Sequence, residues 1–356
     1  MRRHYSQLVP FTAVNQQLIE QGASVKGERI AGVDASFVPK SGKKTEGLGQ
    51  FYNGCHGKSE RGLEWSALCI IDLEQNTAYT LNATQTLPTS EQKGEESRTQ
   101  QYLSQVQHHR QAIPEDVKYL VADGYYSKKD WIDGICELDL HAIGKLRHDA
   151  HLKYFYTGPQ KPRGRKRLYG GKVDLHHIDS PPAHVSGFEW MHSVQEDNVE
   201  LYRAWVYAPA FKRAIQVVYV LKVTPTSFSY ALLFCTDESL SALDVYRYYK
   251  ARFQIEFIFR DGKQFLGLTH CQARDAQKLN FHVNSVLMTL NVLKVHHFKQ
   301  QKQKNTRKPF SVSNYKRRAF NHYLLDTFLN KSGLKQTCEK YQTPYLQCLD
   351  IGRIEA

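Results

Sequence analysis

The first part of the chain alternates between apolar and polar positions in a pattern typical of β-strands. Residues 29–39, RIAGVDASFVP, alternate with a period of two around a polar Asp34. Residues 63–86 predict two further strands that are joined as a hairpin at residues 74–76. The intervening residues 40–62 are rich in Gly, Lys and Ser, so we expect a long loop there. The pattern therefore predicts three strands of antiparallel type.

The pattern then changes to one in which helices and strands alternate. Residues 91–112 have the polar character of a long helix. Residues 117–122 predict a buried strand that runs into Asp123 and Gly124, and a helix through Cys136 leads to a strand at 141–146. Three antiparallel-type strands followed by a parallel strand–helix–strand unit are the order expected of an α/β fold with an RNase H-like mixed sheet flanked by helices.

The second half of the chain begins with short alternating runs that are separated by turns rich in Pro and Gly. These runs predict a β-rich insertion with hardly any helix. After it, residues 279–298 predict an amphipathic helix, 301–318 a basic linker and 315–330 a further helix. The expected division is a short helical lead-in (1–28), the first part of an RNase H-like catalytic core (29–148), the β-rich insertion (149–236), the second part of the core (237–300) and a basic C-terminal tail (301–356).

The stretch from 249 to 263, YKARFQIEFIFRDGK, combines a charged stripe with an apolar side. In a helix of about 100° per residue, Tyr249, Arg252, Glu256 and Lys263 fall within an arc of roughly 60°. One carboxylate therefore shares a narrow face with two cations and a phenol. A solvated stripe with an Arg252–Glu256 pair would explain this pattern, at a gain of a few tenths of a kcal/mol. A metal-binding carboxylate flanked by phosphate-binding cations is the alternative.

Two aspartates on strands favour the second interpretation. A carboxylate inside an apolar strand, such as Asp34, is costly unless it is paired or binds a metal. Asp123 follows a strand, where ligands of open α/β sheets gather, although Asp-Gly is also a common turn signal. Asp34, Asp123 and Glu256 can together hold a pair of Mg²⁺ or Mn²⁺ ions, which prefer oxygen ligands. Two such ions activate an attacking hydroxyl and stabilise the leaving oxygen of a phosphodiester.

The overall charge of the chain favours a polyanionic binding partner. The 356 residues carry a formal net charge of +13 with a pI near 9.3, which favours nucleic acid. No apolar run approaches membrane-spanning length, and the N-terminus is too polar for a secretory signal. Seven scattered cysteines without a CxxC pair indicate reduced thiols, so we expect a cytoplasmic protein without a membrane partner.

A basic loop at residues 158–172, GPQKPRGRKRLYGGK, is a second candidate for nucleic-acid binding. Its Pro-Arg-Gly-Arg core suits a loop that follows phosphates or enters a minor groove. A solubilising surface hairpin is the alternative explanation. The DNA-binding candidates in this loop are Arg163, Arg165, Lys166 and Arg167.

The spacing Y-x2-R-x3-E-x6-K from Tyr249 to Lys263 resembles the YREK signature of the fourth insertion-sequence family of DDE transposases. The surrounding YYKARFQIEFIFRDGKQFLGLTHCQAR resembles the third-carboxylate region of that family. GVDASFVPKSGKKTEGLG resembles its first-aspartate region, and VADGYYSKKDWID resembles its second. The resemblance covers residues 29–300 and is most specific in the four-residue signature.

The resemblance implies an RNase H-like fold and metal-dependent cut-and-paste DNA transposition at insertion-sequence ends. Asp34, Asp123 and Glu256 would be the catalytic metal ligands for two Mg²⁺ or Mn²⁺ ions, and Tyr249, Arg252 and Lys263 would hold transposon-end phosphates. The partners would be double-stranded DNA, as terminal inverted repeats and target, and a second copy of the chain in a synaptic homodimer. Only 28 residues precede the first-aspartate strand, so the alternative is an inactive or truncated remnant that only binds DNA. A structure-specific nuclease that never joins strands is a further alternative.

Overall fold

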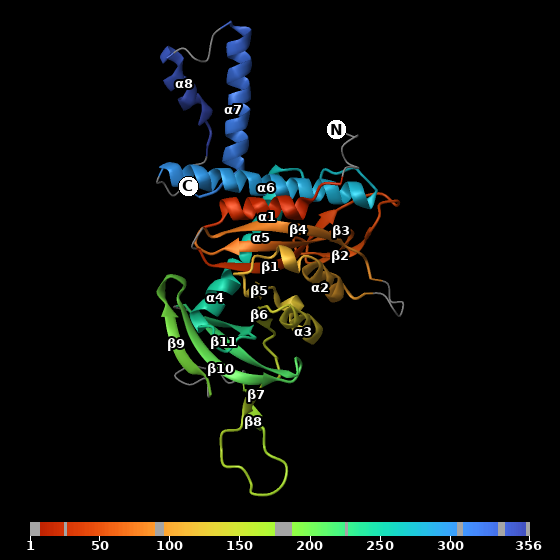
Figure 1. The fold of residues 1–356 in the computed structure, drawn as a ribbon, viewed down its shortest axis with the longest axis vertical. Helices are drawn as coiled ribbons and strands as arrows, with labels where there is room; N and C mark the ends of the chain where they lie inside the picture. The colour runs from red at the N-terminus through yellow and green to blue at the C-terminus, as the bar shows by residue number, and fades with distance from the viewer. Residues whose placement is uncertain are drawn as a thin grey trace.

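The computed structural model describes residues 8–24, 27–89, 96–174, 187–224, 227–304, 309–333 and 339–353. Figure 1 shows the arrangement of its elements. The helices are α1 (Phe11–Gly22), α2 (Arg98–His108), α3 (Lys129–Glu137), α4 (Ala242–Ala251), α5 (Phe253–Phe265), α6 (Ala276–Lys304), α7 (Val312–Lys331) and α8 (Glu339–Leu349). The strands are β1 (Arg29–Pro39), β2 (Gly49–Asn53), β3 (Lys58–Asp72), β4 (Thr77–Thr86), β5 (Tyr119–Val121), β6 (His141–Leu146), β7 (Lys153–Phe155), β8 (Tyr169–Lys172), β9 (Glu189–Val194), β10 (Val199–Ala208), β11 (Arg213–Val223) and β12 (Phe228–Cys235).

Five strands form the centre of the sheet in the order β4-β3-β1-β5-β6. The neighbours β4, β3 and β1 are antiparallel, whereas β5 is parallel to both β1 and β6. Three antiparallel strands followed by two parallel crossovers make this an RNase H-like fold. The fold class expected from the order of elements is therefore confirmed.

The β-rich segment that follows β6 extends the same sheet. Strand β12 pairs antiparallel with β6, and the sheet continues through β11 and β10 to β7 and β8. Figure 1 shows these strands curling away from the core on the side opposite α6. Because β12 leads directly into α4, the last inserted strand fixes where the following helices begin.

The expected loop at residues 40–62 is wrong over its second half. Strand β2 pairs with the first residues of β3, from Gly49 opposite Gly62 to Asn53 opposite Lys58. Phe51 of β2 is fully buried, which gives this hairpin its own apolar anchor. Residues 40–62 are rich in Gly and Lys, and the burial of β2 depends on one aromatic side chain. The sequence pattern therefore did not indicate this strand.

The two faces of the sheet are covered by different helices. In β1, Ile30 and Val38 belong to a core that also contains apolar side chains of α4, α5 and α6. Ala31 and Val33 point to the other face, where α2 and α3 supply the covering side chains. This alternation with period two also orients the polar residues of β1. Asp34 therefore faces the side that α5 covers.

Helix α6 covers the outer edge of the sheet with hydrogen bonds from its side chains. Asn284 accepts from the backbone N–H of Ala83 and donates to its carbonyl, and Asn291 does the same with Thr80. Lys294 donates to the carbonyl of Ala78. An uncovered edge strand would expose unpaired backbone groups. These side chains satisfy such groups on β4.

The expected single helix over residues 249–263 is interrupted. Helix α4 begins earlier, where the Ser241 side chain accepts from the N–H of Asp244, and it ends at Ala251. Helix α5 begins at Phe253. Arg252 lies between them with its N–H shared by the carbonyls of Tyr248 and Tyr249. The break separates Tyr249 and Glu256 onto different helices.

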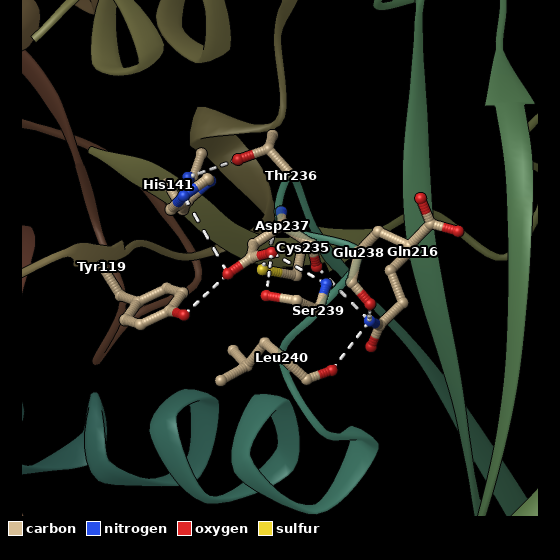
Figure 2. Close-up of polar contacts among 10 residues, drawn as sticks. Tyr119, His141, Gln216, Cys235, Thr236, Asp237, Glu238, Ser239 and Leu240 are labelled. Atoms are coloured by element: carbon tan, nitrogen blue, oxygen red, sulfur yellow. Dashed lines mark hydrogen bonds and ion pairs between the residues drawn. The ribbon is translucent and has the colours of Figure 1, made fainter. Parts of the chain in front are cut away.

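A polar cluster fixes the chain where it passes from β12 into α4 (Figure 2). Tyr119 donates to the carboxylate of Asp237 at 2.7 Å, and Ser239 donates to the same carboxylate through its N–H and its hydroxyl. The Gln216 side chain donates to the carbonyl of Leu240. Tyr119 begins β5, so this cluster lies at the amino end of the parallel strands. It holds the start of α4 against the sheet.

The C-terminal part contains α7, which confirms the helix expected at residues 315–330. Helix α6 continues through Lys304 into the expected linker, and α7 follows from Val312, capped by Ser311. Figure 1 shows α7 projecting from the body with α8 beside it. Of the helices within the described ranges, none is long and apolar enough to cross a membrane.

Candidate active site

One face of β1 supplies the central part of the site. Gly32, Asp34 and Ser36 alternate along the strand and so point to the same side of the sheet. A Cβ on Gly32 would lie 2.7 Å from a methyl of Ile255, so the missing side chain allows α5 to approach closely. Ser36 receives a hydrogen bond from the Lys263 ammonium at 2.8 Å. Helix α5 is thus held against β1 at two positions.

Asp123 lies next to Asp34 across the parallel pair of strands. The register pairs Gly32 with Val121, and Asp34 and Asp123 each come two residues later. Side chains paired in register point to the same face, so both carboxylates lie on the α5 side. Asp123 follows the end of β5 and accepts from the N–H of Tyr125 at 2.8 Å. This bond caps the short 3₁₀ turn Gly124–Tyr126 and orients the carboxyl group.

Glu256 joins these aspartates through Arg252. The guanidinium of Arg252 donates from Nη1 to Asp34 Oδ2 and from Nη2 to Glu256 Oε1, each at 2.9 Å. The other oxygen of Asp34 accepts from the N–H of Ala35 at 2.8 Å. A single planar cation therefore connects a carboxylate of β1 with a carboxylate of α5.

The electrostatics of Asp34 reflect its burial first and its charged neighbours second. Burial raises the pKa of Asp34 to about 6, although the neighbouring Arg252 lowers it. The carboxylates of Asp123 and Glu256 raise this pKa further, which means that both lie near Asp34. The three acids from separate segments therefore share one region of the fold.

The remaining residues of the stripe lie beside this region. Tyr249 presents its ring to Arg252, with the guanidinium 5.8 Å from the ring centre, and burial raises the pKa of its phenol. Burial also lowers the pKa of Lys263. Both side chains are therefore partly withdrawn from solvent.

The carboxylate oxygens of Asp34, Asp123 and Glu256 are of the kind that binds a hard divalent cation. In this structure, however, they do not form a complete set of metal ligands. Aspartate and glutamate oxygens are the ligands that Mg²⁺ and Mn²⁺ prefer. Within the part of the chain that the structure describes, no group of three or more His, Cys, Asp or Glu side chains is arranged to hold a metal ion. The guanidinium of Arg252 lies between two of the three candidates.

The basic loop lies apart from the carboxylates. It connects β7 with β8 and extends from the end of the molecule opposite α7 (Figure 1). Arg163, Arg165 and Lys166 are exposed. Arg167 instead folds back, donating to the carbonyls of Tyr169 and Gly170.

Contacts within this loop give it a defined base. The guanidinium of Arg167 lies over the Tyr156 ring at 4.5 Å from its centre. The Gln160 side chain donates to the Arg167 carbonyl and accepts from its N–H. Arg167 therefore shapes the loop that presents the other three cations.

Two residues of this site were not predicted from the sequence. Ser36 anchors Lys263, and Gly32 allows the approach of Ile255. The period-two pattern of β1 contains the signal for both, since each is an even number of residues from Asp34. Their importance depends on the helix that packs against them, which no local pattern reveals.

Comparisons with known proteins identify a family. A protein-family model described as a transposase DDE domain matches residues 26–292, which is more than half of the chain. No curated protein matches the chain. Among solved structures, the chain resembles a piggyBac transposase in a synaptic complex with hairpin DNA, with a TM-score of 0.42 and 12% identity over 92% of this chain. The alignment spans 58% of that solved chain. The fold assignment itself depends on the strand order.

Proposed function

This chain belongs to the family of transposases with a DDE domain, and from that premise we propose that it cuts DNA at the ends of an insertion sequence and joins the cut ends to a target. The reaction would be cut-and-paste transposition. Two copies of the chain would act together, one at each terminal inverted repeat. The YREK signature at Tyr249, Arg252, Glu256 and Lys263 supports membership of the fourth insertion-sequence family within this larger group.

The observation that carries this proposal is the association of three acids from distant segments. Asp34 lies on β1, Asp123 lies two residues past the end of the neighbouring parallel strand β5, and Glu256 shares Arg252 with Asp34. A structural role for one buried acid would not require two more beside it. Burial is the main cause of the raised pKa of Asp34, and the Asp123 and Glu256 carboxylates raise it further. A buried acid with a perturbed pKa and charged neighbours is typical of functional sites.

Enzymes of the DDE family use divalent metal ions, and here Asp34, Asp123 and Glu256 would hold two Mg²⁺ or Mn²⁺ ions. Bound metal would supply an activated hydroxyl and stabilise the leaving oxygen of the phosphodiester. The protein side chains would orient the DNA. Arg252 is suited to grip a phosphate through its fork of N–H groups, and Lys263 through its point charge.

We predict that Glu256→Gln, Asp34→Asn and Asp123→Asn each lower strand cleavage by on the order of 10³-fold or more, because each removes a charged metal ligand. The measurement is nicking of a duplex that carries the DNA flanking the gene, in the presence of Mn²⁺. Binding of the same duplex in a gel shift should persist. Asp130→Asn, on the exposed face of α3, is the matched control and should cleave normally. Nicking by the Glu256→Gln protein at the wild-type rate would refute the assignment.

A DNA-binding protein that no longer cuts is the second candidate. The observation in its favour is that Arg252 occupies oxygens of both Asp34 and Glu256. The nicking assay separates the two candidates. A remnant would shift the duplex on a gel and leave it uncut in Mn²⁺, whereas a transposase would also transfer the cut 3′-hydroxyl into a target plasmid.

A further inference from the structure

We infer that Arg252 acts as a resident cation that keeps Asp34 and Glu256 engaged in the free protein, so that metal binding depends on DNA drawing Arg252 away. This inference rests on the proposed function, because it assumes that these carboxylates are metal ligands. It adds a mechanism that would restrict metal loading to the DNA-bound protein.

The first argument is that the carboxylate oxygens are already occupied. Asp34 accepts from Arg252 on Oδ2 and from the Ala35 N–H on Oδ1, so each of its oxygens has a protein donor. Glu256 accepts from Arg252 on Oε1. A divalent cation that joins Asp34 Oδ2 to Glu256 Oε1 would lie against the guanidinium that already joins these two oxygens, and the two positive charges repel each other. Arg252 and a metal bound between these two oxygens are therefore alternatives.

The second argument is that Arg252 is held firmly by these two contacts and by Tyr249, whose phenol also interacts with the guanidinium. Its side chain is only 15% exposed and that of Asp34 18%, whereas Glu256 is 43% exposed. Salt screens the Asp34 pair much less than a surface pair. Among the described residues, no other Lys or Arg side chain is in ion-pair contact with Asp34 or Glu256. Arg252 thus supplies the positive charge that offsets their repulsion.

The third argument concerns what would release Arg252. Its Nε is buried and lacks a hydrogen-bond partner within the described part of the chain. A phosphate oxygen is an acceptor that could satisfy this group, and a guanidinium binds phosphate in bidentate fashion. Arg252 is also the single residue at the junction of α4 and α5, where its backbone keeps a helical conformation. A phosphate of bound DNA therefore offers Arg252 a better set of partners than the carboxylates alone.

The coupling between DNA binding and metal binding must be reciprocal. If DNA releases the carboxylates for metal, bound metal releases Arg252 for DNA, and each ligand raises the affinity of the other by the same factor. Displacing two charge-assisted hydrogen bonds corresponds to roughly a tenfold change in affinity or more.

The test measures Mn²⁺ binding directly, by the loss of the free-ion signal in electron paramagnetic resonance, on the full chain with and without a short duplex of mixed sequence. Wild type is compared with Arg252→Gln and with Arg260→Gln, which removes an exposed arginine of α5 that pairs with Asp261. We expect Arg252→Gln to bind Mn²⁺ about tenfold more tightly than wild type without DNA. The duplex should raise the affinity of wild type and of Arg260→Gln, but leave that of Arg252→Gln unchanged.

Addition of Glu256→Gln to each protein separates this inference from the proposed function. If wild type and Arg252→Gln bind Mn²⁺ equally, DNA changes neither, and Glu256→Gln abolishes binding in both, the inference is wrong and the metal site stands. If no protein binds Mn²⁺ in a manner sensitive to Glu256→Gln, with or without DNA, both fail. Arg252→Met replaces Arg252→Gln if thermal melting shows that the latter is unfolded, and the effect of DNA on wild type requires no variant.

Discussion

At the scale of single residues, Gly32 determines how closely α5 approaches the strand that carries Asp34. A Cβ at this position would lie 2.7 Å from a methyl of Ile255 and 2.9 Å from a methyl of Ile71. The position is central in β1, where a glycine normally weakens a strand. The glycine is therefore explained by close packing between β1 and α5, which brings Glu256 to the aspartates.

We predict that Gly32→Val lowers the free energy of unfolding by about 1–3 kcal/mol, because it overpacks the contact between β1 and α5. Urea denaturation measures this change. Strand cleavage should fall as well, since Glu256 moves with α5. The control is Gly171→Val in β8, where a Cβ meets open space. Equal loss of stability in the two variants would contradict the packing argument.

The site residues differ in how far the sequence predicts them. The spacing from Tyr249 to Lys263 predicts four side chains on one helical face, because that prediction depends only on the helical repeat. The break at Arg252 and its bond to Asp34 were not predicted. These two residues are far apart in the sequence, and their contact depends on how α5 is set against β1.

At the scale of elements, the contact between α6 and β4 includes an unusual buried cation. The Lys294 side chain is buried, donates to the Ala78 carbonyl and lies within 6.0 Å of the ring centres of Tyr79 and Phe310. Burial lowers the pKa of Lys294 from 10.5 to about 8. A base with a depressed folded-state pKa penalises the folded state while it is charged, so stability is gained as the pH rises from about 8 towards 10.5.

We predict that the free energy of unfolding of wild type rises relative to that of Lys294→Met between pH 8 and pH 10.5. The relative gain should approach about 3 kcal/mol, since each pKa unit corresponds to about 1.4 kcal/mol. Denaturation of both proteins across this range measures the difference, and other titrating groups cancel between them. Lys299→Met, an exposed lysine of the same helix, should show no such trend. A difference between wild type and Lys294→Met that stays constant with pH would refute the prediction.

At the scale of the whole molecule, positive charge is presented at separate places. The net charge of +13 indicates a polyanionic partner, and the loop between β7 and β8 carries exposed Arg163, Arg165 and Lys166 at one end of the molecule. Helix α7 carries exposed Arg317 and Arg318 at the other end (Figure 1). The net charge alone does not show which of these regions contacts DNA.

We predict that Arg163→Gln with Arg165→Gln lowers the slope of log affinity against log salt concentration by about 2, because each lost phosphate contact contributes about 0.9. The measurement is DNA binding across a series of salt concentrations. Arg317→Gln with Arg318→Gln removes the same charge from α7 and should lower the slope by less than half as much. If both pairs lower it equally, the loop has no special role in DNA binding.

The sequence by itself determined most of the order of strands and helices, with β2 as an exception, the acids on β1 and after β5, and the charged face of the Glu256 helix. These features follow from local periodicity, which each segment expresses without reference to the others. The five-part division of the chain and the roles of the site residues stay predictions.

Only the tertiary structure decided that β12 pairs with β6 to make one continuous sheet, that β2 completes a hairpin with β3, and that Arg252 joins Asp34 to Glu256. Strands β12 and β6 are far apart in the sequence, and so are Arg252 and Asp34. Which segments pair depends on which apolar faces of the sheet and helices are still uncovered once the sheet has formed. A local sequence pattern shows which face of a strand or helix is apolar, but not which other segment will cover it.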